Sequence, residues 1–123
     1  MATISPTITN LPPNDGSVLR YVWVLTGTND GAPMPFAQWA DRSVQIGTAA
    51  DTWGGGTVVW EGSNDDGLTW FTLTDAQTTA ISKTANGLEQ VVELTQLARP
   101  RATVGVTQVT IYCVARRMQP MRT

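Results

Sequence analysis

A run of residues near the end of the chain alternates strictly between two kinds of side chain. The apolar half of the alternation consists of Val109, Ile111, Cys113 and Ala115. The other half consists of Gln108, Thr110, Tyr112, Val114 and Arg116. Because successive side chains of a strand point to opposite faces, the pattern predicts a strand with one buried face, which a second layer has to cover. Cys113 is therefore expected to be a small core residue and not a reactive thiol.

Shorter runs rich in Val, Ile, Thr and Trp precede this strand, and turn residues separate them. Residues 18–25 predict a strand that is covered in part on both faces. Residues 36–48 predict two short strand pieces, and the residues expected to be buried there are Phe36, Trp39, Val44 and Ile46. In residues 57–61, Val58 and Trp60 share one face of a predicted strand. The residues on its other face are Thr57, Val59 and Glu61.

The stretch between the hairpin region and the final strand is less regular. Asn86-Gly87 predicts a turn, after which residues 88–95 alternate as a strand of about eight residues, with a helix as the alternative. Arg99-Pro100-Arg101 predicts a bend that leads out of this strand. About seven to nine short strands and no clear helix result. The sequence therefore predicts an all-β fold, a single-domain antiparallel β-sandwich of the jelly-roll or Ig-like kind.

The length of the chain suits one domain with one ordinary core. A folded chain of 123 residues buries about two-thirds of the surface that it exposes when unfolded. Residues 1–17 are polar and rich in Pro and Thr, and they predict an extended N-terminal arm or first edge strand. Residues 18–117 form the predicted sandwich domain, and residues 118–123 form a short C-terminal tail.

The absence of histidine and the presence of a single cysteine exclude several kinds of chemistry. A Ser-His-Asp triad, a Cys-His pair, an imidazole metal ligand and an intrachain disulfide are all impossible. The N-terminus lacks the basic start and the apolar run of a signal peptide, and no window is apolar enough to span a membrane. We expect a protein that folds in a cytoplasm and is not an enzyme.

Residues 63–70, with the sequence SNDDGLTW, predict a tight hairpin. The residues that fit the Asp-box pattern, a motif similar to that of sialidase propellers, are Ser63, Asp65, Gly67, Thr69 and Trp70. Asp65 can accept hydrogen bonds from loop amides, Gly67 supplies a positive φ, and Trp70 packs beneath the turn. In the proteins that it resembles the box is structural, and a propeller would need several copies of it. The motif therefore predicts a structural hairpin and no sialidase activity.

The acidic residues do not form a recognisable metal or catalytic site. The candidates for a calcium site are Asp51, Asp65, Asp66 and Asp75, but EF-hand spacing is absent. The candidates for glycoside hydrolysis are Glu61, Glu89 and Glu93, and all three occupy strand positions that are expected to be exposed. No nucleophile, base and orienting group stand out together. The sequence thus predicts no metal, no cofactor and no catalytic residues.

The net charge of −2 is distributed unevenly. Residues 1–98 carry all ten acids and three basic residues, a balance of −7, whereas residues 99–123 carry five arginines and no acid. The five arginines are Arg99, Arg101, Arg116, Arg117 and Arg122. Arginine suits fixed contacts at interfaces, so this end of the chain is a candidate partner contact. The alternative is that the basic strand pairs with acidic neighbours in its own sheet.

Five tryptophans among 123 residues are an excess. Trp23, Trp60 and Trp70 lie on predicted strands or directly after the hairpin turn, which favours the core. Trp39 and Trp53 lie in sequence next to loops and are the better candidates for an exposed contact with a protein or a sugar ring. Nucleic-acid binding is not expected, because the chain is acidic and its arginines are few.

Three stretches of the chain together carry a resemblance to a known family. They are GGTVVWEGSNDDGLTWFTLTD, ANGLEQVVELTQLARPRATVG and VTQVTIYCVARR, and they span about residues 54–117. A Gly-initiated strand, an EGS-type hairpin that ends in Thr-Trp, an Arg-Pro pair and a last strand that ends in Arg-Arg resemble small structural proteins of tailed bacteriophages. Within that family they resemble capsid decoration, or cement, proteins.

The resemblance implies a mechanical function. A decoration protein binds the outside of the assembled phage head, so the expected partner is the major capsid protein, and the expected location is the outer capsid surface after production in the bacterial cytoplasm. A homo-oligomer, a dimer or trimer, would match a symmetric lattice. The expected contact residues are Ile4, Pro6, Ile8, Leu11, Trp39, Trp53, Arg99, Arg101, Arg117 and Arg122. The alternative is a tail, collar or fibre module that binds a host receptor or carbohydrate.

Overall fold

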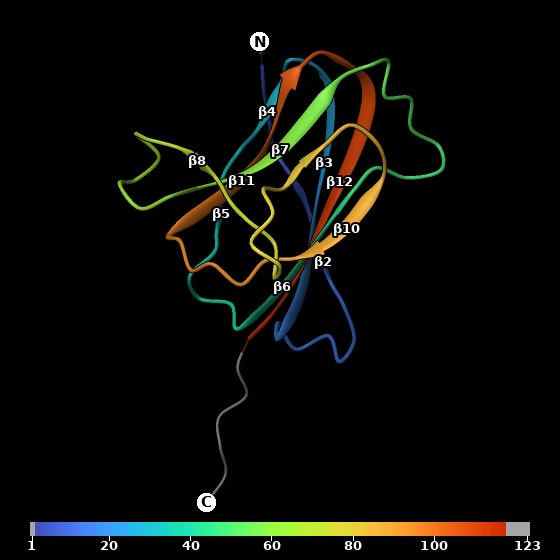
Figure 1. Ribbon diagram of the computed structural model, residues 1–123. Helices are drawn as coiled ribbons and strands as arrows, with labels where there is room; N and C mark the ends of the chain where they lie inside the picture. Colours follow the sequence, from blue (N-terminus) through green and yellow to red (C-terminus); the bar gives the residue numbers. More distant parts are fainter. Residues whose placement is uncertain (1, 118–123) are drawn as a thin grey trace, which may run out of the picture.

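A computed structural model describes residues 2–117, which form two β-sheets packed face to face (Figure 1). The seven-stranded sheet contains β1 (Thr3–Ile4), β4 (Asp30–Gly31), β5 (Met34–Pro35), β7 (Thr57–Ser63), β8 (Phe71–Thr72), β9 (Ser82–Lys83) and β11 (Leu97–Val104). The five-stranded sheet contains β2 (Thr7–Asn10), β3 (Val18–Gly27), β6 (Asp41–Ile46), β10 (Gly87–Gln90) and β12 (Val106–Arg116). Within these residues there is no helix, and so none that could cross a membrane. The prediction of an all-β sandwich is confirmed, with one parallel pair, β1–β4, among antiparallel ones.

The strand with strict alternation lies in the middle of the five-stranded sheet. β12 pairs with β3 on one side and with β6 on the other, both antiparallel, so that Ile111 is opposite Trp23 and Ile46. The predicted inward face, from Val109 to Ala115, is fully buried. Burial raises the pKa of the Cys113 thiol to about 12, which makes it an inert core residue as expected.

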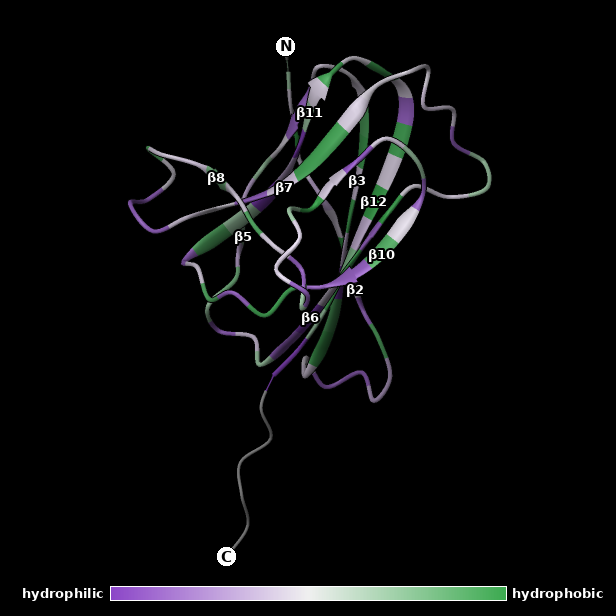
Figure 2. Ribbon diagram, in the orientation of Figure 1, coloured by the Kyte–Doolittle hydropathy of each residue, from purple (hydrophilic) through white to green (hydrophobic). Residues whose placement is uncertain are grey.

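Aromatic side chains join the two sheets in the core. Trp23 on β3 and Trp60 on β7 are both fully buried and meet edge to face, with ring centroids 5.6 Å apart. Phe36 packs against the same Trp60 ring at 5.9 Å. The Trp23 indole N–H donates to the carbonyl of Ala32 at 3.1 Å, so its polar atom is satisfied. In Figure 2 apolar colour marks β3, β7 and β12, the strands that form this core.

The prediction of a bend at Arg99-Pro100-Arg101 is wrong. Pro100 does not bend the chain out of a strand but lies within β11, opposite Trp60 of β7. The N–H of Trp60 donates to Ile81 and its carbonyl accepts from Leu73, so the ladder requires no amide from Pro100. On the other side of β11, Pro100 falls between the residues that pair with β5 and with β4. A proline is therefore tolerated in the interior of the sheet.

The strand predicted for residues 88–95 is shorter than expected. β10 ends at Gln90, and Val91 then forms an isolated bridge to Asp75 and enters the core. The following residues leave the sheet, so Val92 and Leu94, which the alternation assigns to one strand face, are exposed. The helix alternative is also wrong. Similarly, residues 36–40 form turns and not a strand, and β6 is the one strand between Phe36 and Gly47.

Residues 2–10 contribute a short strand to each sheet. β1 pairs with β4, and the carbonyls of Ala2 and Ile4 accept hydrogen bonds from Asp30 and Ala32. β2 then pairs with β3 at the edge of the other sheet. The segment thus crosses from one layer to the other. We therefore expect that its removal would expose an edge of both sheets.

The close approach of β4 to Pro100 gives a test of the packing. A Cβ on Gly31 would lie 2.7 Å from Pro100 Cδ and from Trp23 Cδ1, so Gly31→Ala overpacks the core and should lower the free energy of unfolding by about 1–3 kcal/mol. Gly105→Ala is the matched control, because its nearest new neighbours lie at 3.9 Å. Urea denaturation of both variants measures the difference. Equal stability of the two would contradict this packing.

Candidate functional site

The hairpin between β7 and β8 is held by hydrogen bonds from its own residues. Asp65 Oδ1 accepts from the Ser63 hydroxyl at 2.8 Å and from the Thr69 amide at 2.8 Å. The Gly67 amide donates to Ser63 Oγ, and Gly67 has a φ of 87°. The Trp70 indole N–H donates to the Gly67 carbonyl at 2.9 Å. The five Asp-box residues therefore build one self-contained turn, as the sequence predicts.

A cluster of four charged residues occupies the outer face of the seven-stranded sheet. Glu61 on β7 accepts from Arg99 Nε at 3.2 Å and from Arg101 Nε at 3.0 Å, both on β11. Arg99 also donates to Asp30 on β4 at 3.0 Å. Glu61 is only 3% exposed, so its predicted place on an exposed strand face is wrong. Two carboxylates and two guanidiniums neutralise one another there.

Trp70 covers one end of this charged cluster. The Arg99 guanidinium lies over the indole ring, 4.1 Å from its centroid, and the Asp-box turn holds that ring in place. The hairpin and the charged cluster are thus one structural unit on β7. Arg99 and Arg101 thus pair with acidic residues of their own sheet, which is the alternative to a partner contact. Arg116 likewise pairs with Asp41.

The two tryptophans proposed as exposed contacts do not form an aromatic platform. Trp39 is 2% exposed, because its ring packs edge to face on Tyr21 and its N–H donates to the Pro35 carbonyl. Arg117 lies over this ring at 5.3 Å. Trp53 is half-buried against the core, and its N–H donates to Asn86 Oδ1 at 2.8 Å. The prediction that Trp39 is an exposed contact residue is therefore wrong. Its position in a turn did not indicate that its ring packs against Tyr21 in the core.

The other predicted contact residues are spread over the molecule. In the N-terminal segment Ile4, Pro6 and Leu11 are partly buried, with Ile4 against the core, and Ile8 is 55% exposed on edge strand β2. Arg117 is exposed at the end of the described chain. Arg122 and the tail 118–123 lie outside the described residues. Within residues 2–117 the predicted contact residues therefore do not lie together in a single site.

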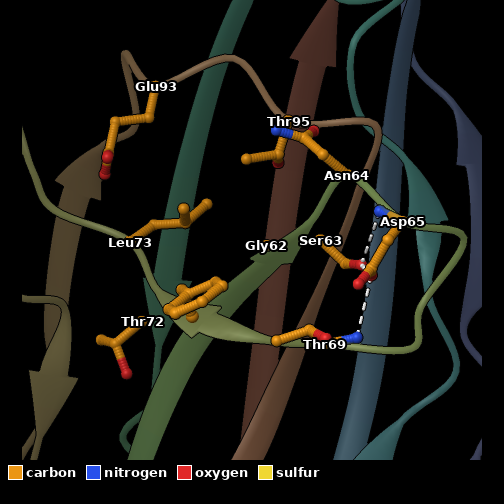
Figure 3. Close-up of a pocket in the computed structure, with 10 residues that line it drawn as sticks. Gly62, Ser63, Asn64, Asp65, Thr69, Thr72, Leu73, Glu93 and Thr95 are labelled. Atoms are coloured by element: carbon orange, nitrogen blue, oxygen red, sulfur yellow. Dashed lines mark hydrogen bonds between the residues drawn. The ribbon is translucent and has the colours of Figure 1, made fainter.

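A cavity of about 330 Å³ opens beside the Asp-box hairpin (Figure 3). Its residues come from the end of β7, from the hairpin with β8, and from residues 93–95. Figure 3 shows Asp65 and Glu93 at opposite sides of the opening, with Leu73 and the Gly62 backbone between them. The Glu93 carboxylate is oriented by two bonds, because its Oε1 accepts from the amide and the hydroxyl of Thr74.

The sequence did not predict four exposed apolar side chains in the segments that line this cavity. They are Leu68, Phe71, Val92 and Leu94, which are exposed by 85%, 69%, 55% and 66%. The alternation in residues 88–95 concealed two of them by assigning them to a strand. A leucine at the tip of a polar turn was the available signal, because turn tips are usually polar.

The acidic residues considered as metal ligands serve other purposes. Among residues 2–117 no three Cys, Asp or Glu side chains are placed to hold a metal ion. Asp51 fastens the loop before β7 onto β12: burial by itself would raise its pKa, but hydrogen bonds from the Thr110 amide and hydroxyl outweigh burial and lower the pKa. Asp75 accepts from the amides of Gln77 and Thr79 and closes a second turn.

Comparison with known proteins shows a shared fold. No protein-family model and no curated protein matches the sequence. The SPBc2 prophage-derived protein YomS superposes with a TM-score of 0.63 at 11% identity, over 89% of this chain and 93% of that one. An oxalate oxidase chain superposes with a TM-score of 0.52 at 14% identity, over 94% of this chain but 53% of that one. A cupin domain from Bordetella pertussis has a TM-score of 0.44 at 12% identity.

Breaking the charged cluster should strongly destabilise the fold. The Arg99 side chain is largely buried, and Glu61→Ala removes one of its two carboxylate partners. We therefore expect a loss of about 3 kcal/mol in the free energy of unfolding. Arg116→Ala breaks an exposed ion pair and should cost less than about 1 kcal/mol. Denaturant titration of the two variants compares them. A loss for Glu61→Ala no larger than that for Arg116→Ala would contradict the role of the cluster.

The Asp-box turn should make stability depend on acid pH. Hydrogen bonds from the Thr69 amide and the Ser63 hydroxyl lower the pKa of Asp65 from its ordinary 3.8 to about 2. The stabilisation by this carboxylate is therefore fully present above about pH 5 and is lost as the pH falls toward 2. Asp65→Asn should lower the melting temperature at pH 6, and the difference from wild type should shrink by pH 2. A difference that is constant with pH would refute the assignment.

Proposed function

We propose that the chain is a structural protein of a tailed-phage particle, and that it acts as a decoration protein on the outside of the assembled head. The observation that carries the proposal is the likeness of fold to a prophage-derived protein over nearly the whole length of both chains. The sequence resemblance of residues 54–117 to phage structural proteins supports it independently. The proposed role is structural and not enzymatic.

The proposed mechanism is ordinary linkage between binding and assembly. A protein that binds the assembled shell and not its separate subunits stabilises the shell by the free energy of that binding. A rigid sandwich suits this role, because most of its contact surface is formed before binding and little ordering is needed. Here two of the predicted basic contact residues, Arg99 and Arg101, form ion pairs within the chain, so the partner contact is expected elsewhere on the surface.

The copy number of the protein in purified virions tests this proposal. A decoration protein follows the lattice, so quantitative mass spectrometry should give a ratio to the major capsid protein near one or a simple fraction of one. A few copies per particle would instead indicate a tail, collar or fibre module. Absence from the particle would overturn the virion proposal as a whole.

A further inference from the structure

Four exposed apolar residues line the cavity beside the Asp-box hairpin or stand next in sequence to residues that line it. Leu68 and Phe71 belong to the hairpin and to β8, and Val92 and Leu94 belong to the segment that runs from β10 to β11. We call these four residues the hairpin-end patch. All are more than half exposed, and Leu68 is 85% exposed. Exposed apolar side chains that border a common cavity mark an interaction surface more often than single exposed ones do.

The two segments that carry the patch are fastened to each other. The Gln96 amide donates to Asn64 Oδ1 at 2.8 Å, and the Gln96 side chain exchanges two hydrogen bonds with Asp66, at 3.0 and 2.7 Å. Thr74 donates to Glu93 through its amide and its hydroxyl. The patch is thus held in place before any partner arrives, and binding there requires little ordering.

Three acidic residues belong to the same two segments as the patch. They are Asp65, Asp66 and Glu93, and none of them forms an ion pair within residues 2–117. Two of them, Asp65 and Glu93, line the cavity of about 330 Å³ together with Phe71 and Leu73. That volume lies within the usual range of ligand pockets. The cavity therefore combines an apolar wall with two carboxylates.

This chemistry fits a basic side chain from a protein partner. The aliphatic stem of an arginine or lysine can lie along Phe71 and Leu73, while its cationic head reaches the Glu93 carboxylate at one side of the opening. A second copy of the chain is a poor partner for this surface, because a two-fold contact would bring two acidic rims together.

We propose that the hairpin-end patch is the surface by which this protein binds the phage shell, and that it docks on an apolar area of a shell subunit from which an arginine or lysine enters the cavity. This inference rests on the proposed function and names the contact surface and the chemistry of the partner. The N-terminal segment and the arginines of β11 are not required for this contact.

Binding to shells that lack the protein tests the proposal. Purified wild type and variants are added to such particles, and bound protein is measured by co-sedimentation over a range of concentrations. Leu68→Ser/Leu94→Ser changes two loop residues, and Phe71→Ser changes the cavity wall. Each should weaken binding at least about tenfold, as the loss of central interface residues does. Thermal unfolding checks that each variant is folded.

A matched pair of exposed apolar residues outside the patch serves as the control. Leu88→Ser/Val104→Ser removes side chains that are 66% and 52% exposed, on β10 and β11, and should change binding less than about twofold. Patch variants that bind as wild type does would overturn the assignment of the surface and leave the decoration proposal standing. Failure of wild type to bind shells would overturn both the decoration proposal and the partner named here.

Substitutions that conserve shape but remove charge test the chemistry of the partner. Glu93→Gln and Asp66→Asn keep a side-chain oxygen as hydrogen-bond acceptor but remove the charge. Together they should weaken binding several-fold at low salt and reduce its dependence on salt. Unchanged affinity and salt dependence would exclude a basic partner. Binding of wild type to purified host surface polysaccharide, abolished by Phe71→Ser, would replace the protein partner with a glycan.

Discussion

The contact between Trp23 and Trp60 is the interaction on which the two-layer arrangement depends. Each ring lies on the inner face of a different sheet, and the edge-to-face contact brings β3 and β7 to a fixed distance. Phe36 packs against the same Trp60 ring, and Gly31 lets β4 approach Trp23 without a side chain between them. The short strands at the edges of both sheets are placed by this core.

β7 is unusual because both of its faces are buried. Its inner face carries Val58 and Trp60, and its outer face carries Val59 and Glu61, which are almost as inaccessible. A buried carboxylate needs partners, and the arginines of β11 supply them. The hairpin that follows β7 turns back so that Trp70 covers Arg99. The Asp-box turn therefore reverses the chain and also positions Trp70 over the charged cluster.

The two sides of the same hairpin differ in their chemistry. On one side Trp70, Arg99 and Glu61 satisfy one another within the fold. On the other side Phe71 and the Glu93 carboxylate face an open cavity. Charges that are paired inside the chain contribute little to the binding of a partner. Exposed apolar side chains near unpaired carboxylates can contribute both apolar contact and charge. This contrast is why the partner contact is proposed beside the cavity and not at the arginines.

The sequence by itself determined the elements whose signal is local. Alternation every second residue defined the inner faces of β12 and β7, and the spacing of Ser63, Asp65 and Gly67 defined the hairpin, because strand periodicity and turn chemistry depend on neighbouring residues. Only the tertiary structure decided what depends on contacts between distant segments. Pro100 fits inside β11 because Trp60 bonds to other strands, Trp39 is buried because Tyr21 lies against it, and Glu61 is paired because β11 is its neighbour.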